Sequence, residues 1–325
     1  MYSDIVLCMI ESRGEALGFW TDYGRKRTEE LRMPAGIVHA LHGERIWEWL
    51  EKEGVVAREK LVKDAFDWGK QGPDFLFCHR FFPWQKGESL CELGGCLHRE
   101  PPENILRVLQ QLYQDRPVPM IRSYIMGFLC HYSLDRTCHP YIEWLSKKLL
   151  EQEPEQTEEI LHNEIESALD GIVLRWEVGK LPTDFSLGSC FPKNEEVEEN
   201  IEMIYSALLK TLFGVTGKTK ELRQAEKDAR LAFRIMNDRT GLKKQLVSRL
   251  EKKGKRTISC HLRGMLEADE IDYANTGHEQ WEDRTGKSHT EDFFQLFETA
   301  EQDTRKLFSR FTEASPEELA EKKYF

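Results

Sequence analysis

The segment Cys130-His131-Tyr132-Ser133-Leu134-Asp135-Arg136-Thr137-Cys138-His139-Pro140 carries the strongest structural signal in this sequence. It contains the pattern His-x3-Asp-x3-His within an apolar, aromatic-rich stretch. Side chains four positions apart lie on the same face of a helix, so we expect His131 and Asp135 to point at one place. Pro140 disfavours helical backbone in the residue before it, and His139 is therefore expected to leave the helix.

A second pair, His162 and Glu166, follows with the same spacing. Imidazole and carboxylate groups one helical turn apart suit zinc and similar divalent ions. A single pair of this kind is more often a salt bridge or a hydrogen bond in a protein core. Two pairs together with His139 favour a metal site over that alternative.

The composition is that of a folded, acidic protein. The 325 residues are enough for one large domain or two, and the 40% hydrophobic content supports a buried core. The net charge of −11 argues against binding nucleic acid or an anionic membrane by bulk electrostatics, which needs a basic face. A phosphate substrate is compatible with this charge because bound zinc ions would invert the local field.

The eight cysteines show no tightly spaced framework, which favours reduced, buried thiols in a cytoplasmic protein over disulfides. Ile5 to Ile10 is a short apolar run between Asp4 and Glu11, without the basic leader or cleavage site of an export signal. No apolar run reaches the length of a membrane span. The oligomeric state cannot be predicted from these features.

The apolar pattern predicts an all-α fold, a bundle of several helices with a helical C-terminal extension. We expect helices at about 35–53, 60–68, 102–113, 121–138, 157–174, 196–212, 218–237, 242–252 and 291–311. Thr290 is expected to cap the last of these. Ser315-Pro316-Glu317-Glu318 is typical of a capping box and predicts a short final helix. No repeat and no strand-rich region is expected.

Three parts follow from this pattern. Residues 1–32 are polar and poorly patterned, and we expect this leader to lie outside the fold. Residues 33–179 are expected to form the metal-binding helical domain. Beyond Gly179 a loop rich in Gly, Pro and Ser leads into residues 180–325, a helical region of unknown role.

Other residues could complete the site. Asp74 lies on the tight loop Gln71-Gly72-Pro73-Asp74 and is either a turn aspartate or a ligand held by that loop. His98 follows Gly94-Gly95, which we expect to be a flexible loop. His39 and His42 are one turn apart on the first helix, so either could face inward. Three histidines in the C-terminal region have no partner at ligand spacing and are expected on the surface or in loops: His261, His278 and His289.

These motifs occur in a characteristic order: Met33-Pro34-Ala35-Gly36-Ile37-Val38-His39, Gln71-Gly72-Pro73-Asp74, His98, Gly127 to Asp135 with His139-Pro140, and His162-x3-Glu166. Together they resemble the bacterial zinc-dependent phospholipase C family over residues 33–175. The resemblance implies an all-helical domain that binds two or three zinc ions through histidines and carboxylates.

The resemblance also implies a ligand set for each ion. One ion would be bound by Asp74, His98, His131 and Asp135. A second would be bound by His139, His162 and Glu166, although His139 follows Asp135 more closely here than in the secreted members. A third ion would share Asp135 and add His39.

The chemistry implied is hydrolysis of a phospholipid or a related phosphodiester into a diacylglycerol-like alcohol and a phosphorylated head group. Two or more zinc ions can hold the diester, lower the pKa of a water molecule and stabilise the departing alkoxide. Asp135 is suited to bridging two ions because a carboxylate has two oxygens. Asp74 is the expected general base, or the group that orients the attacking water.

The amino terminus differs from the secreted members, in which the mature terminus itself ligates the third zinc. Here thirty-two residues precede Met33-Pro34. Either the third site is incomplete, or the protein begins at Met33 and Pro34 becomes a terminal ligand.

Two other functions stay open from the sequence. Zinc-dependent single-strand nucleases share a similar trinuclear helical fold, but the acidic charge and the lack of a basic, aromatic groove count against them. A non-catalytic metal-binding protein that acts on a partner through its C-terminal helices is the other alternative.

Overall fold

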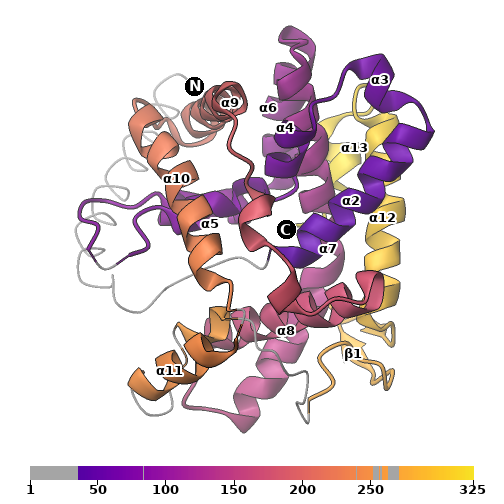
Figure 1. Cartoon of the computed structure of the whole chain (residues 1–325). Coiled ribbons are helices and arrows are strands. Elements are labelled where there is room, and N and C mark those ends of the chain that lie inside the picture. Colours follow the sequence, from indigo (N-terminus) through magenta and orange to yellow (C-terminus); the bar gives the residue numbers. More distant parts are fainter. Residues whose placement is uncertain (1–35, 83, 239, 252–255, 257, 263–270) are drawn as a thin grey trace, which may run out of the picture. The chain divides into compact units, whose positions relative to one another are not determined.

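A computed structural model describes residues 36–82, 84–238, 240–251, 256, 258–262 and 271–325. The prediction that residues 1–32 are a separate leader lies outside the described residues and stays a prediction. The described part of the chain is helical apart from one small strand pair, which confirms the predicted all-α class (Figure 1). None of its helices combines the length and apolar character that a membrane crossing requires.

The elements follow one another in this order: α2 (Ile37–Lys52), α3 (Val55–Glu59), α4 (Lys63–Gly69), the 3-10 helix η2 (Gly72–Cys78), α5 (Cys91–Arg99), α6 (Pro102–Asp115), α7 (Pro119–Gln152), α8 (Glu158–Val178), η3 (Pro182–Asp184), η4 (Leu187–Cys190), α9 (Glu195–Phe213), α10 (Thr219–Met236), α11 (Leu242–Leu250), η5 (Ser259–His261), β1 (Trp281–Glu282), β2 (Ser288–His289), α12 (Phe293–Arg310) and α13 (Pro316–Ala320). The two strands pair antiparallel, with Trp281 opposite His289.

Helix α7 is the central element, and α2, α4, α8 and α12 all pack against it. Its closest neighbour is α4. A Cβ atom on Gly69 would lie 2.1 Å from the Tyr124 carbonyl oxygen, and one on Gly127 would lie 2.3 Å from the Phe66 carbonyl oxygen. Only glycine fits at both positions, because any side chain would push the two backbones apart. This close crossing fixes α4, and the η2 segment that follows it, against the motif helix.

The prediction that His139 leaves the helix is wrong, because α7 continues through Pro140 to Gln152. An internal proline removes one backbone hydrogen bond and costs about 3 kcal/mol. Beyond it, α7 buries Tyr141, Ile142 and Leu145 in the core. Burial of side chains this large stabilises by about 1.5–3 kcal/mol each, which outweighs the proline penalty.

Three local expectations also differ from the structure. Gly94 and Gly95 lie inside α5, where a Cβ on Gly94 would come within 3.2 Å of Leu76 and Phe77, so close packing against η2 explains this glycine. Lys60 adopts a left-handed backbone, φ 54°, which ends α3 and delays the next helix to Lys63. Asp292, and not Thr290, caps α12. The capping box at Ser315 is confirmed.

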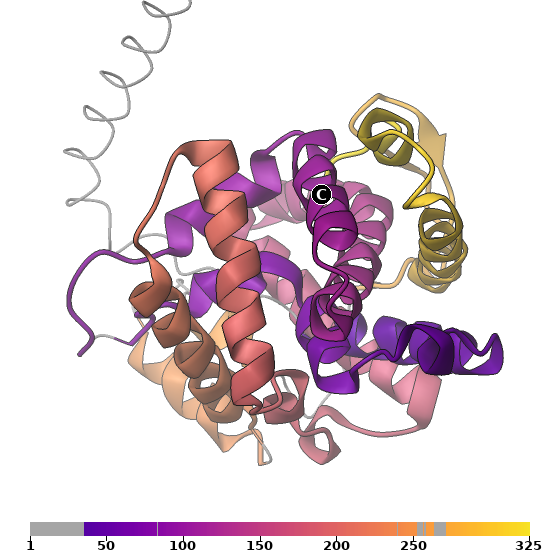
Figure 2. The same cartoon turned by 90° about the horizontal axis from the view of Figure 1, so that it is seen from above.

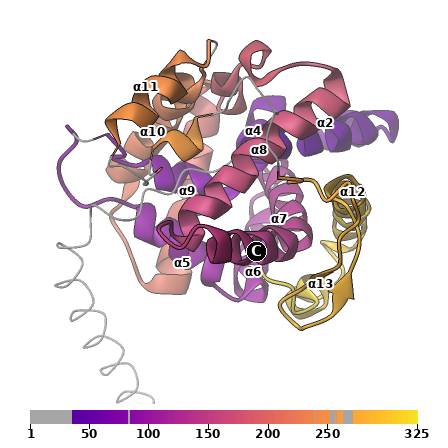
Figure 3. The same ribbon diagram turned by 90° about the horizontal axis from the view of Figure 1, so that it is seen from below.

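The C-terminal helices share the hydrophobic core of the motif helix. Phe297 and Leu307 of α12 belong to the same buried cluster as Leu134 and Tyr141 of α7. Figures 2 and 3 both show α12 and α13, in yellow, along one side of this region, with α13 packed on α6. The division at residue 179 stays a prediction from composition.

Buried carboxylates also meet between α9 and α10. Glu226 of α10 is fully buried, and neither of its oxygens has a hydrogen-bond partner among the described residues. Glu198 and Glu202 of α9 lie close by and are paired with Arg230 and Arg223. Burial raises the pKa of Glu226 to about 9, and the two neighbouring carboxylates contribute. Glu226 is therefore neutral at physiological pH.

This predicts that replacing Glu226 by glutamine stabilises the protein at alkaline pH. A carboxyl whose pKa is higher in the folded state than in the unfolded state makes stability fall as the pH rises, here between about 4.5 and 9. The glutamine variant has no such proton to lose, so its stability relative to the wild type should rise by about 4 kcal/mol between pH 5 and pH 8. Urea unfolding at pH 5 and pH 8 measures this. A stability difference that is the same at both pH values would contradict it.

Candidate metal centre

The position of His39 is set by Asp170, a residue outside the sequence motifs. Asp170 of α8 is fully buried, and its two carboxylate oxygens accept hydrogen bonds from the backbone N–H groups of Gly36, at 3.2 Å, and Val38, at 2.8 Å. Helix α2 has no side-chain cap of its own, so Asp170 takes that role from a distant helix. Asp170 lies one turn after Glu166 on α8, and this spacing in the sequence indicates that the two carboxylates share a helix face.

Asp135 is the centre of the cluster. Its Oδ2 lies 3.1 Å from His131 Nε2, and its Oδ1 lies 3.3 Å from His39 Nε2 and 3.7 Å from His139 Nε2. The two oxygens therefore face different imidazoles, and the side chain is almost fully buried. The ligand atoms of His39, His131 and Asp135 all lie within 4.8 Å of one another.

A second group brings together Asp74, His98 and His131. Asp74 is buried in η2, and its Oδ1 lies 3.0 Å from His98 Nε2. His98 Nδ1 donates a hydrogen bond to the Gly94 carbonyl oxygen at 2.8 Å. A carbonyl can only accept, so Nδ1 carries the hydrogen and Nε2 has its lone pair available, as in most metal-ligating histidines.

His131 belongs to both groups and is held in a fitted slot. Neither of its ring nitrogens has a hydrogen bond of good geometry among the described residues, although Nε2 lies close to Asp135. Buried polar atoms are rarely left in this state. Gly72 adopts φ +54°, and a Cβ atom there would lie 2.2 Å from the His131 ring. The glycine of the Gly-Pro-Asp loop therefore makes room for this imidazole.

The third group contains His139, His162 and Glu166. Glu166 Oε1 lies 3.1 Å from His162 Nε2, one turn earlier on α8, and 3.4 Å from His139 Nε2 on α7. Because α7 remains helical, His139 lies one turn after Asp135 and faces both acidic residues. The structure thus brings all eight predicted site residues into one place.

The electrostatics of the cluster favour a bound cation. Burial raises the pKa of Asp135 well above its usual value, and the carboxylates of Asp74 and Glu166 add to this. Burial lowers the pKa of His39 to about 3 and that of His131 well below its usual value. The two histidines are therefore neutral at physiological pH, the state in which imidazole binds metal.

The other histidines lie apart from the cluster. His42 is fully buried but packs on Phe297 and has its Nε2 3.3 Å from Thr304 Oγ1, so His39 is the member of that pair that reaches the site. His278 is exposed, as expected. The expectation of a surface or loop position is wrong for His261, which is buried in η5.

A small pocket adjoins the cluster. Its polar lining comes from His39, Asp135, His139 and Glu166. Its apolar lining consists of Val38, Leu134, Cys138, Ile142, Leu169 and Phe293. Carboxylates and imidazoles thus face a small cavity with apolar walls, the usual composition of a small-molecule site.

Comparison with known proteins assigns the family. The pattern that defines the zinc dependent phospholipase C family matches residues 38–215, more than half of the chain. The chain belongs to this family. The match confirms the resemblance drawn from the motifs, and the zinc-dependent phospholipase C region contains every residue of the three groups. Neither a curated protein nor a solved structure matches the chain.

The residues present fit zinc. The donors are imidazole nitrogens and carboxylate oxygens, which are zinc ligands, and the buried Nε2 of His131 lacks a hydrogen bond and would be satisfied by an ion. The seven cysteines among the described residues form no disulfide, and none of them belongs to the three groups.

Proposed function

We propose that this protein is a zinc-dependent phosphodiesterase that hydrolyses a phospholipid or a related phosphodiester. The observation that carries the proposal is the position of Asp135, whose two oxygens face different histidines at the wall of a pocket. The family match supports the same chemistry.

The ligand roles follow the three groups. Asp74, His98, His131 and Asp135 would hold one ion, and Asp135 with His39 would hold a further one. His139, His162 and Glu166 would hold the remaining ion. When bound, zinc would lower the pKa of a water molecule and neutralise charge on the diester.

Asp74 is the proposed general base. It is held rigidly in η2 with its Oδ1 3.0 Å from His98 Nε2, and its other oxygen can orient water or accept its proton. The apolar wall formed by Leu134, Leu169 and Phe293 would exclude bulk water around the reacting diester.

The test of this function is metal analysis together with turnover. We expect two or three zinc ions per chain after expression with added zinc, and zinc-dependent hydrolysis of bis(p-nitrophenyl) phosphate and phosphatidylcholine in preference to single-stranded DNA. Zinc below about half an equivalent per chain would contradict the metal centre. Preference for DNA would favour a nuclease, and full zinc occupancy without turnover would favour a non-catalytic protein.

Replacing Asp74 by asparagine is expected to lower turnover more than zinc content. The amide keeps one ligating oxygen and the shape of the side chain but cannot accept a proton. General acid–base groups contribute about 10²–10⁴-fold, so a loss of kcat of at least about 100-fold is expected with most zinc retained. Metal analysis and kcat on one preparation decide this. If zinc and kcat fall in proportion, Asp74 is a ligand only.

A further inference from the structure

Phe325 inserts its ring into the metal centre from a segment outside the family match. Its ring centroid lies 5.6 Å from that of His98 and 6.0 Å from that of His131, and it also packs on Tyr132 at 4.8 Å. Only 5% of Phe325 is exposed, whereas the preceding Tyr324 is 47% exposed. The ring therefore packs on His98 and His131, two of the three members of the Asp74–His98–His131 group.

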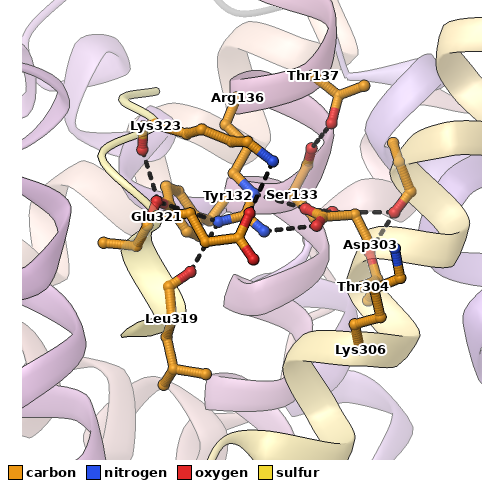
Figure 4. A network of polar contacts seen from close by, with 12 residues as sticks. Tyr132, Ser133, Arg136, Thr137, Asp303, Thr304, Lys306, Leu319, Glu321 and Lys323 are labelled. Carbon is orange, nitrogen blue, oxygen red and sulfur yellow. Dashed lines mark hydrogen bonds and ion pairs between the residues drawn. The ribbon is translucent and has the colours of Figure 1, made fainter. Parts of the chain in front are cut away.

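Hydrogen bonds from the motif helix hold this segment, residues 319–325, in place (Figure 4). Tyr132 Oη donates to the Lys323 carbonyl oxygen at 2.6 Å, and Arg136 donates to the Leu319 carbonyl oxygen at 2.9 Å. Arg284 donates to the main-chain oxygen of Phe325 at 2.8 Å. Tyr132 and Arg136 directly follow His131 and Asp135 on α7, so neighbours of the candidate ligands fix the path of the segment.

The path itself is strained. Glu321 and Lys322 have left-handed backbones, with φ of 51° and 58°. Such conformations cost about 1–2 kcal/mol for residues other than glycine, and they persist only where contacts impose them. The contacts on Phe325 and the hydrogen bonds from α7 supply that constraint. A segment that combines local strain with a few anchoring contacts can open without unfolding the helices.

The pocket beside Asp135 lies on a different side of the cluster from Phe325. Its lining includes Asp135 and Glu166 but none of Asp74, His98 and His131, the group that Phe325 overlies. Access to the two sides of the centre therefore differs. One side faces a small cavity, and the other faces an aromatic ring.

We propose that Phe325 is a specificity-determining cover that controls access to the Asp74–His98–His131 group and limits the size of the molecules that reach it. This proposal rests on the metal centre of the proposed function but does not need the protein to turn over a substrate. With the cover in place, only small molecules reach the centre. Without it, bulkier molecules reach the Asp74–His98–His131 group as well.

The test compares Phe325→Ala with Tyr324→Ala, a change in the adjacent exposed ring. The readouts are the rates of zinc release to a small chelator, dipicolinate, and a larger one, EDTA, and kcat/KM for micellar phosphatidylcholine relative to bis(p-nitrophenyl) phosphate. For Phe325→Ala we expect release to EDTA to rise about tenfold, with a smaller rise for dipicolinate. Where substrates are turned over, the ratio should shift towards the phospholipid. Tyr324→Ala should match the wild type.

A second variant weakens the cover without removing a buried ring, so that it tests the proposal even if Phe325→Ala fails to fold. Tyr132→Phe keeps the aromatic packing but removes the hydrogen bond to Lys323, and should speed release to EDTA about threefold. If zinc release depends on chelator size but no substrate is turned over, the proposal about Phe325 stands and the proposed enzymatic function is overturned. Release rates equal to those of Tyr324→Ala for both chelators, or equal increases for both, would overturn the cover whatever the activity.

Discussion

Replacing Asp135 by alanine is expected to remove zinc from two positions at once and to lower turnover by at least about 100-fold. The carboxylate faces His131 with one oxygen and His39 and His139 with the other, so it is placed to serve more than one ion. Losing a residue that only orients a metal ligand costs about 10–100-fold, and loss of a bridging ligand should cost more. Zinc per chain and kcat/KM on a soluble diester are the measurements.

His39→Ala is the matched comparison, because His39 contacts one oxygen of Asp135 and stacks on His131. It should lose one ion at most. Equal zinc contents in the two variants would argue against a bridging carboxylate.

Asp135→Asn separates ligation from folding. Burial raises the pKa of Asp135 well above its usual value, so without metal this carboxyl destabilises the folded state. In zinc-free buffer the asparagine variant should be at least as stable as the wild type, while it still fails to retain zinc. Lower stability of the metal-free variant would show that Asp135 acts mainly in structure.

Replacing Arg136 by methionine is expected to destabilise the protein by about 3–5 kcal/mol. Arg136 is buried and donates two hydrogen bonds of 2.5 Å to the carboxylate of Asp303 on α12 (Figure 4). Removing the arginine leaves Asp303 as an uncompensated buried charge, with Ser133 Oγ as its remaining donor in this network. Urea denaturation of the zinc-loaded protein measures the loss.

The control is the double variant Arg136→Met with Asp303→Leu. Exchanging both members of a buried ion pair for apolar residues of similar size is often neutral or stabilising. The double variant should therefore recover much of the stability lost in the single one. If it remains as unstable as Arg136→Met, the other hydrogen bonds of Arg136, to the 319–320 carbonyl oxygens, are the more important contacts.

Much of the candidate centre could be predicted from the sequence because it depends on local geometry. His131 with Asp135, and His162 with Glu166, are one turn apart on helices, and this spacing alone places each pair on one face. Gly72 lies two positions before Asp74, and glycine is required there because φ is positive and the His131 ring is in contact. The order of these motifs was sufficient to predict the family.

Other features depend on contacts between distant segments, which no local pattern reveals. A proline rule predicted that His139 would leave the helix, but core packing along the rest of α7 outweighs the cost of Pro140. Asp170 reaches the start of α2 from more than 130 positions away. Phe325 reaches His98 and His131 only because α12 and α13 pack on α7 and α6.

The sequence alone therefore determined the helical class, the family resemblance and the two pairs at one-turn spacing, because helix periodicity acts within a few residues. The tertiary structure decided how those pairs meet, which of His39 and His42 faces the centre, and what lies over it. The physical reason is that packing between helices is set by side-chain fit and burial across the whole chain, where a single backbone crossing such as Gly69 on Gly127 fixes positions far away.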